Sequence, residues 1–134
     1  MITEGIKGLR EITVSERETA RALGSGELDV LGTPALLAGI EETAWRSISG
    51  FLEEGTTTVG TRIEMNHLSA TPVGMKVRFE TEVTLVDRRR IVFRAEAYDA
   101  SGKIAEGSHE RFVVQAEKFQ RKAEEKKEAA GSGD

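Results

Sequence analysis

Apolar residues recur at steps of three and four over the stretch that follows Thr33. They are Leu36, Leu37, Ile40, Ala44, Ile48, Phe51 and Leu52. This spacing predicts an amphipathic helix from Pro34 to Glu54, ended by Gly55. Thr33 is the predicted N-cap, and Pro34 is tolerated next because its missing N–H needs no partner there. We expect this longest apolar stripe to form the central helix of the domain.

After Gly55 the apolar period changes from 3.6 to 2, which indicates half-buried strands. The predicted long strands cover residues 59–67, 75–85, 91–97 and 104–115. On the first of them, Val59, Thr61 and Ile63 share a face with His67, and Gly60 belongs to the opposite face. Turn signals at 71–74 and 100–102 imply short connections and therefore an antiparallel sheet.

The two ends of the chain add shorter elements. Ile12 and Val14 predict a short first strand, and the capping box at 15–18 predicts a short helix that breaks at 24–26. Residues 117–130 are rich in Lys and Glu, which indicates a charged helix before the tail at 131–134. We expect one domain over 1–120, followed over 121–134 by this charged C-terminal helix and a flexible tail.

One long apolar helix packed on one antiparallel sheet makes a two-layer α+β domain. The compact arrangement is the hotdog fold, an antiparallel sheet wrapped around one long central helix. A sheet covered in this way keeps exposed edges, which favour the pairing of two subunits. We therefore expect a homodimer, and a higher oligomer is compatible with the same edges.

Composition narrows the possible functions. The 134 residues suit one domain, and the absence of cysteine excludes a disulfide scaffold, a cysteine nucleophile and a thiolate metal site. The formal charge of -4 gives no general attraction to nucleic acid or anionic membranes. No apolar run reaches the ~20 residues of a membrane span, and residues 1–13 lack the apolar core of a secretory signal. We expect a cytoplasmic protein with neither nucleic acid nor membrane as a partner.

Familiar cofactor motifs are missing as well. The two histidines are far apart and have no ligand-type neighbour at the usual spacing, so no metal site is predicted. Neither a P-loop, a dinucleotide-binding glycine pattern nor a Gly-x-Ser-x-Gly elbow occurs.

Three polar residues on or beside apolar positions are candidates for chemistry. Glu41 lies beside the apolar stripe, where partial desolvation favours a general base, although periodicity alone favours a carboxylate that reaches water from the helix flank. The Thr33 hydroxyl stands at the helix N-terminus, where negative charge is favoured, or it serves only as a cap worth about 1 kcal/mol. His67 ends a strand, where an imidazole either donates or shuttles a proton, or is satisfied by backbone.

Two further positions are candidates for substrate contact. Gly60 permits close backbone approach and an N–H bond to a carbonyl oxygen, or else marks a plain bulge. Arg111, in the polar cluster 108–112, is suited to an anionic or carbonyl group, or to a cross-strand pair with Glu. The three arginines at 88–90 fit a solvated turn better than a phosphate site.

In combination, these spacings resemble the hotdog-fold thioesterases of the fluoroacetyl-CoA thioesterase type. The resemblance rests on Gly32-Thr33-Pro34 with Glu41 eight residues after Thr33, and on the run from Met65 to Gly74 that holds His67, Thr71 and Pro72. It continues through Gly107-Ser108-His109-Glu110-Arg111 to Phe119, and so covers most of the chain.

The resemblance implies a catalytic set of Thr33, Glu41 and His67, with substrate contacts at Gly60 and Arg111. It also implies a dimer with active sites at the subunit interface, an acyl-CoA substrate, and neither a metal nor another cofactor. One feature departs from the family: its fluoroacetyl-specific enzyme is associated with an aromatic lid before the catalytic Thr, whereas no Phe, Tyr or Trp precedes Trp45 here. Thioester hydrolysis therefore carries over better than fluoroacetyl specificity.

The predicted function is hydrolysis of a small or medium acyl thioester. Glu41 acts as base or nucleophile in this hypothesis. The main alternative is a hotdog protein that binds acyl-CoA or a small hydrophobic ligand without cleaving it. A dehydratase on the same fold is a third hypothesis. Acyl length, and the choice between CoA and carrier protein, depend on packing that the sequence does not specify.

Overall fold

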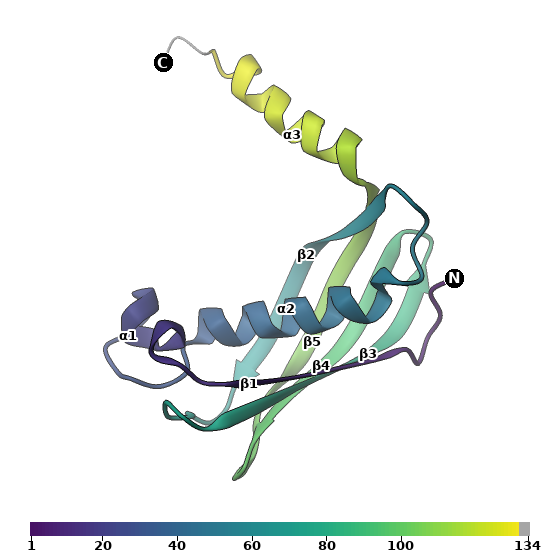
Figure 1. The fold of residues 1–134 in the computed structure, drawn as a ribbon. Helices are drawn as coiled ribbons and strands as arrows, with labels where there is room; N and C mark the ends of the chain where they lie inside the picture. The colour runs from purple at the N-terminus through teal and green to yellow at the C-terminus, as the bar shows by residue number, and fades with distance from the viewer. Residues whose placement is uncertain (132–134) are drawn as a thin grey trace.

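The computed structural model describes residues 1–131 of the chain. Figure 1 shows one long helix lying across a curved sheet, with a second long helix projecting from the C-terminal end of the last strand. The elements in order are β1 (Lys7–Thr13), η1 (Glu16–Glu18), α1 (Ala20–Leu23), α2 (Thr33–Ser49), β2 (Thr56–His67), β3 (Lys76–Asp87), β4 (Arg90–Asp99), β5 (Gly102–Gln115) and α3 (Ala116–Ala129).

The strands form one antiparallel sheet in the order β1-β3-β4-β5-β2. Helix α2 lies across one face of this sheet (Figure 1), so the predicted α+β hotdog architecture is confirmed. The first strand extends further toward the N-terminus than its two apolar residues suggested. β1 and β2 form the two edges of the sheet.

The core lies between α2 and the concave face of the sheet. The inward residues of α2 recur at four-residue steps and are fully buried, as the apolar stripe predicted: Leu36, Ile40, Ala44 and Ile48. Facing them, Phe79 on β3 and Phe93 on β4 are also fully buried. A Cβ added at Gly39 would lie 2.3 Å from the Phe79 ring, so glycine lets the helix pack closely on the sheet.

The central helix is shorter than predicted. It ends at Ser49 with Gly50 as its C-cap, rather than continuing to Glu54. The chain then turns, and Phe51, which the periodicity placed in the helix, is 48% exposed. Gly55 adopts a positive φ of 85° in the connection to β2, so it serves the turn and not the helix end.

The alternation predicted for β2 and β3 breaks at irregularities. In β2 the register shifts between Gly60 and Arg62. This bulge puts Thr58 and Gly60 on the helix side with Ile63, in place of the predicted Val59 and Thr61. In β3 a similar shift after Val83 leaves Leu85 39% exposed. A single extra residue reverses the face of every position on one side of it, which a strict period of two does not anticipate.

The N-terminal connection contains less helix than predicted. The carboxylate of Glu18 accepts a hydrogen bond from the Ser15 N–H at 2.8 Å, as a capping box requires. The segment forms only the turn η1 and the short α1, which ends at Gly24 with φ of 74°. The predicted break at 24–26 is therefore confirmed.

The predicted C-terminal helix is confirmed as α3, whose residues are all exposed. The predicted flexible tail at 131–134 lies almost wholly outside the described residues. Among the residues that the structure describes, no helix is both long enough and apolar enough to cross a membrane.

Candidate active site

Thr33 and His67 meet at the N-terminal end of α2. The Thr33 hydroxyl lies 2.8 Å from Nδ1 of His67, although the two residues are 34 positions apart in sequence. The predicted capping role of Thr33 is wrong: Gly32 is the N-cap, and Thr33 is already the first helical residue. Its hydroxyl is therefore free to bond the imidazole instead of the helix backbone.

The second nitrogen of His67 is buried but unused. Nε2 has no hydrogen-bond partner of ordinary geometry among the described residues. Burial lowers the pKa of His67 below its ordinary value, and the neighbouring Ser69 backbone opposes that shift. His67 and Thr33 both line an open pocket of about 270 Å³ beside α1. A neutral imidazole that accepts the Thr33 O–H at Nδ1 carries its own proton on Nε2. That N–H is suited to a carbonyl oxygen of a bound ligand.

Glu41 belongs to a second cluster, two turns further along α2. Its Oε2 lies 3.5 Å from Nη1 of Arg111 on β5. The predicted position beside the apolar stripe is confirmed, since Ile40 and Ala44 on the same helix are fully buried. The burial expected around Glu41 is not reached in this chain, because the Glu41 side chain is 44% exposed.

Gly60 forms the floor beneath the Glu41 carboxylate. A Cβ added there would lie 2.5 Å from Glu41 Oε2 and 3.2 Å from Arg111 Nη1. The backbone of β2 therefore approaches both side chains more closely than any other residue type allows. The sequence predicts either close backbone approach or a bulge at Gly60. The structure contains both, since the bulge directly follows it.

The Arg111 guanidinium is hydrogen-bonded to Thr58 and His109, neither of which was a predicted site residue. Its Nε donates to the Thr58 hydroxyl at 2.8 Å, and its Nη2 donates to the Thr58 carbonyl at 3.0 Å. Its Nη1 lies 3.1 Å from Nε2 of His109. Burial lowers the pKa of Arg111, and Glu41 opposes that shift. The guanidinium nevertheless stays charged, as arginine does in proteins.

A signal for His109 was present in the sequence. His109 and Arg111 are two positions apart on one strand, so they point to the same side of the sheet. Both residues belong to the polar cluster at 108–112, of which only Arg111 was a predicted site residue. Thr58 had no such signal, because the bulge at Thr61 puts it on the inner face.

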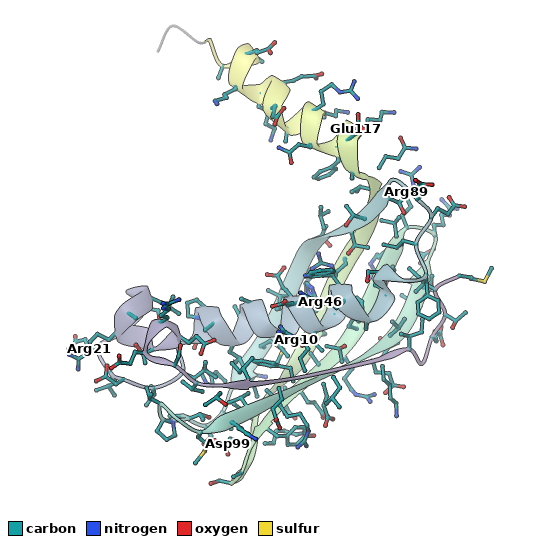
Figure 2. The ribbon with its side chains drawn as sticks, in the orientation of Figure 1. Arg10, Arg21, Arg46, Arg89, Asp99 and Glu117 are labelled. Carbon is teal, nitrogen blue, oxygen red and sulfur yellow. The ribbon has the colours of Figure 1, made fainter. Side chains whose placement is uncertain are left out.

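The neighbouring carboxylate Glu42 has a different environment. Its oxygens contact Arg10 at 2.6 Å and Arg46 at 2.9 Å, and Figure 2 shows these two arginines close together beside α2. Chiefly the hydrogen bond from Arg46, and then the charge of Arg10, hold the pKa of Glu42 below its ordinary value. Glu42 is thus a structural ion-pair partner that faces away from Gly60 and Arg111.

A cross-strand Arg–Glu pair does occur, but not at Arg111. Arg90 donates to both carboxylate oxygens of Glu110, at 3.0 and 3.3 Å. Arg88 and Arg89 are exposed in the turn before β4, as predicted, whereas Arg90, predicted in the same turn, is the first residue of β4. Within residues 1–131, no three His, Cys, Asp or Glu side chains come together as metal ligands.

The Thr33–His67 pair and the Glu41 cluster are well separated within the chain. Thr33 and Glu41 are eight residues apart on α2, which is about 12 Å along a helix axis. Gly60 and His67 are seven residues apart on β2, which is about 23 Å along a regular strand. One chain therefore unites Thr33 with His67, and Glu41 with Gly60 and Arg111, but it does not bring these two sets into contact.

Comparison with known proteins identifies similar chains. A family model described as fluoroacetyl-CoA-specific thioesterase matches residues 14–117. The fluoroacetyl-CoA thioesterase of Streptantibioticus cattleyicolor is 35% identical over 98 residues, which cover 73% of this chain and 70% of that protein.

Solved structures agree with this similarity. A structure of the fluoroacetyl-CoA thioesterase superposes with a TM-score of 0.89 at 31% identity, covering 94% of this chain and 98% of that one. A mutant of that enzyme in complex with fluoroacetate and CoA gives 0.84 at 30% identity, covering 88% and 99%. A thioesterase superfamily member from Thermus thermophilus gives 0.86 at 29% identity, covering 96% and 98%.

Proposed function

The chain belongs to the fluoroacetyl-CoA-specific thioesterase family and is a thioester hydrolase, and we propose that Thr33, Glu41 and His67 carry out its reaction. The observation that carries this proposal is the buried Nε2 of His67, held beside a pocket by the Thr33 hydroxyl and left without a partner. The proposed substrate is an acyl-CoA with a small or medium acyl group, and the proposed location is the cytoplasm.

The proposed reaction consumes one water molecule. Glu41 removes a proton from the water as its oxygen attacks the thioester carbonyl carbon. The Nε2–H of His67 and the positive end of α2 stabilise the oxyanion that forms. The carbon–sulfur bond then breaks, and the proton held by Glu41 passes to the departing thiolate. The products are a carboxylic acid and free CoA thiol, and Gly60 and Arg111 contribute substrate contacts.

We propose that the active unit is a homodimer. The separation of the two clusters supports this, because Thr33 and His67 of one protomer need a Glu41 from elsewhere. A second copy paired along the exposed β2 edge supplies one by symmetry. Pairing also supplies the desolvation that Glu41 lacks in a single protomer.

Fluoroacetyl specificity is not part of this proposal. No aromatic residue precedes Trp45, and Glu27 and Leu28 occupy the stretch before Thr33 where the family's fluoroacetyl-specific enzyme is associated with an aromatic lid. We therefore expect the enzyme to prefer non-fluorinated acyl groups, and a panel of acyl-CoA thioesters ranks that preference.

A thiol-release assay with a matched pair of variants tests the function. Glu41→Gln and Glu42→Gln make the same isosteric change at adjacent positions of α2. Glu41→Gln is expected to lower kcat by at least ~10²-fold, as for loss of a general base. Glu42→Gln is expected to keep turnover within about threefold, because the ion pairs that it loses are partly exposed and worth about 1 kcal/mol or less each.

Two other outcomes have definite meanings. Thermal stabilisation by acyl-CoA without release of thiol from any substrate identifies a binding protein. Interconversion of hydroxyacyl and enoyl thioesters without thiol release identifies a dehydratase. Equal losses in the two Gln variants would contradict the assignment of Glu41 while leaving the hydrolase function standing.

A further inference from the structure

Among residues 1–131, His109 is a buried titratable side chain that the proposed mechanism does not use. It lies on the inner face of β5, is only 1% exposed, and stacks on Phe93 with ring centroids 5.9 Å apart. Its Cε1 borders the same space above Gly60 that Glu41 and Arg111 approach, since an added Cβ there would lie 3.3 Å from it. The imidazole is therefore immobilised at the edge of the Glu41 cluster.

The partners of the ring define its protonation. Nδ1 lies 2.8 Å from the carbonyl oxygen of Arg62, which can only accept a hydrogen bond, so Nδ1 carries the proton. Nε2 lies 3.1 Å from Nη1 of Arg111, which can only donate, so Nε2 offers its lone pair. These two contacts together require the neutral imidazole with its proton on Nδ1. Burial, reinforced by the charge of Arg111, lowers the pKa of His109 in the same sense.

This bond completes the fixation of the Arg111 guanidinium. Thr58 fixes Nε and Nη2, and His109 fixes Nη1, the nitrogen nearest to Glu41. A guanidinium fastened on its Nε and Nη2 edge alone can still tilt at Nη1. The His109 acceptor removes that freedom and holds the charge toward the carboxylate.

We propose that His109 is a positioning residue that aims Arg111 at Glu41 through the lone pair of its Nε2. The role deepens the thioesterase function proposed above and rests on it, since Glu41 is the proposed base. Arg111 in this orientation keeps the carboxylate in one place above Gly60. His109 acts through Arg111 and is not itself a catalytic residue.

A pair of amide substitutions separates this role from simple packing. In His109→Gln the amide reaches the place of Nε2, so its oxygen can accept from Arg111 while the bond to Arg62 is lost. In His109→Asn the amide reaches only the place of Nδ1, so it can donate to Arg62 while Arg111 loses its acceptor. Each variant loses the ring and one hydrogen bond worth about 1 kcal/mol, so their Tm values are expected within about 5 °C of each other.

We expect His109→Gln and His109→Asn to differ in kcat although their Tm values are similar. The kcat of His109→Gln is expected to exceed that of His109→Asn by at least ~10-fold, because the lost interaction leaves Glu41 without a fixed partner. KM is expected to change less than kcat, because Thr58 still holds Nε and Nη2 of Arg111 for its substrate contact. Equal kcat values at equal Tm, or a reversed order, would overturn the positioning role while thiol release by the wild type still upholds the hydrolase.

Nitrogen NMR of the wild-type protein tests the arrangement without any activity. The chain has only two histidines, so loss of one set of imidazole signals in His109→Gln assigns His109. At pH 7.5 we expect the neutral ring protonated on Nδ1. A proton on Nε2, or a charged ring, would overturn the proposal even if both variants fail to fold. If no thioester is hydrolysed, the function fails, and these spectra still decide whether His109 accepts from Arg111.

Discussion

The Thr33 hydroxyl and the His67 imidazole are joined by a 2.8 Å hydrogen bond that ties the start of α2 to the end of β2. The bond occupies Nδ1 of the ring and leaves the buried Nε2 without a partner in the described part of the chain. The N-terminus of α2 and the His67 imidazole thus line one pocket. Both favour a carbonyl oxygen that gains negative charge, which is what attack on a thioester produces.

Substitutions at Thr33 distinguish the bond that its hydroxyl forms with His67 from a role in helix capping. Thr33→Val removes the bond to His67 and is expected to lower kcat by at least ~10-fold, whereas Thr33→Ser keeps the hydroxyl and most of the activity. Because Gly32 is the N-cap, the free energy of unfolding of Thr33→Val should fall by less than the ~1 kcal/mol that loss of a cap costs. Urea unfolding and thiol release measure the two quantities. A large stability loss with normal turnover would restore the capping interpretation.

Gly60→Ala is expected to displace the Glu41 carboxylate without unfolding the protein. The new Cβ would meet Glu41 Oε2 at 2.5 Å, and the end of that flexible, partly exposed side chain can move away. We expect at least a ~10-fold loss of kcat with a small change in Tm. Gly50→Ala is the matched control, because nothing lies within 4 Å of its added Cβ and its φ of -71° suits alanine. Equal activity in the two variants would show that the close approach of Gly60 to the Glu41 carboxylate is not needed for turnover.

Mixing two inactive variants tests whether the active site is shared between protomers. Glu41→Gln keeps an intact Thr33–His67 pair, and His67→Gln keeps an intact Glu41 cluster. In a mixed dimer one site receives both intact halves, so random exchange of subunits should restore about a quarter of wild-type activity. Unfolding and refolding an equimolar mixture before the thiol-release assay measures this. Recovery no greater than the sum of the separate variants would place each site within one protomer.

Stability should fall as pH decreases through the range in which histidine titrates. Burial lowers the pKa of both His67 and His109 below the ordinary value of 6.5. Between that value and the lowered pKa, the unfolded chain binds more protons than the folded one, so the free energy of unfolding decreases as pH falls.

Urea unfolding at pH 7.5, 6.5 and 5.5 measures this dependence. The free energy of unfolding should be nearly constant above about pH 7 and should fall toward pH 5.5. His109→Gln removes one of the two groups and should flatten the slope, and Glu41, Glu110 and Arg111 are the charged neighbours that modulate it. A slope that is unchanged in this variant would assign the effect to other groups.

We propose that the domain itself ends before most of α3. No residue of α3 is buried, and Figure 1 shows the helix projecting away from the sheet. A chain of residues 1–120 retains the hydrogen bond from the Ala116 N–H to the Gly55 carbonyl at 2.9 Å. Its Tm and kcat are expected to match those of the full chain within about 3 °C and threefold. A large loss of either one would assign α3 a packing role between protomers.

The sequence predicted the elements whose pattern is local. The four-residue recurrence from Leu36 to Ile48 and the alternation from Ile91 to Ala97 are confirmed, since burial of one face imposes those periods directly. Together they indicated an α+β sheet wrapped around one helix. The predicted end of that helix was wrong by several residues. The apolar Phe51 and Leu52 continue the period, although the helix has already ended before Gly50.

The sequence supplied candidates for the proposed site but not their arrangement. Residue types and spacing, together with the family resemblance, predicted Thr33, Glu41, Gly60, His67 and Arg111 as site residues. Only the tertiary structure decided that Gly32 caps the helix, which frees Thr33 for His67. Only the bulge at Thr61, whose position depends on pairing with β5, turns Thr58 and Gly60 toward Glu41. The helix-to-strand bond of Thr33 with His67 spans 34 positions, and the strand-to-strand bond of Arg111 with Thr58 spans 53. No local sequence pattern encodes contacts at such separations.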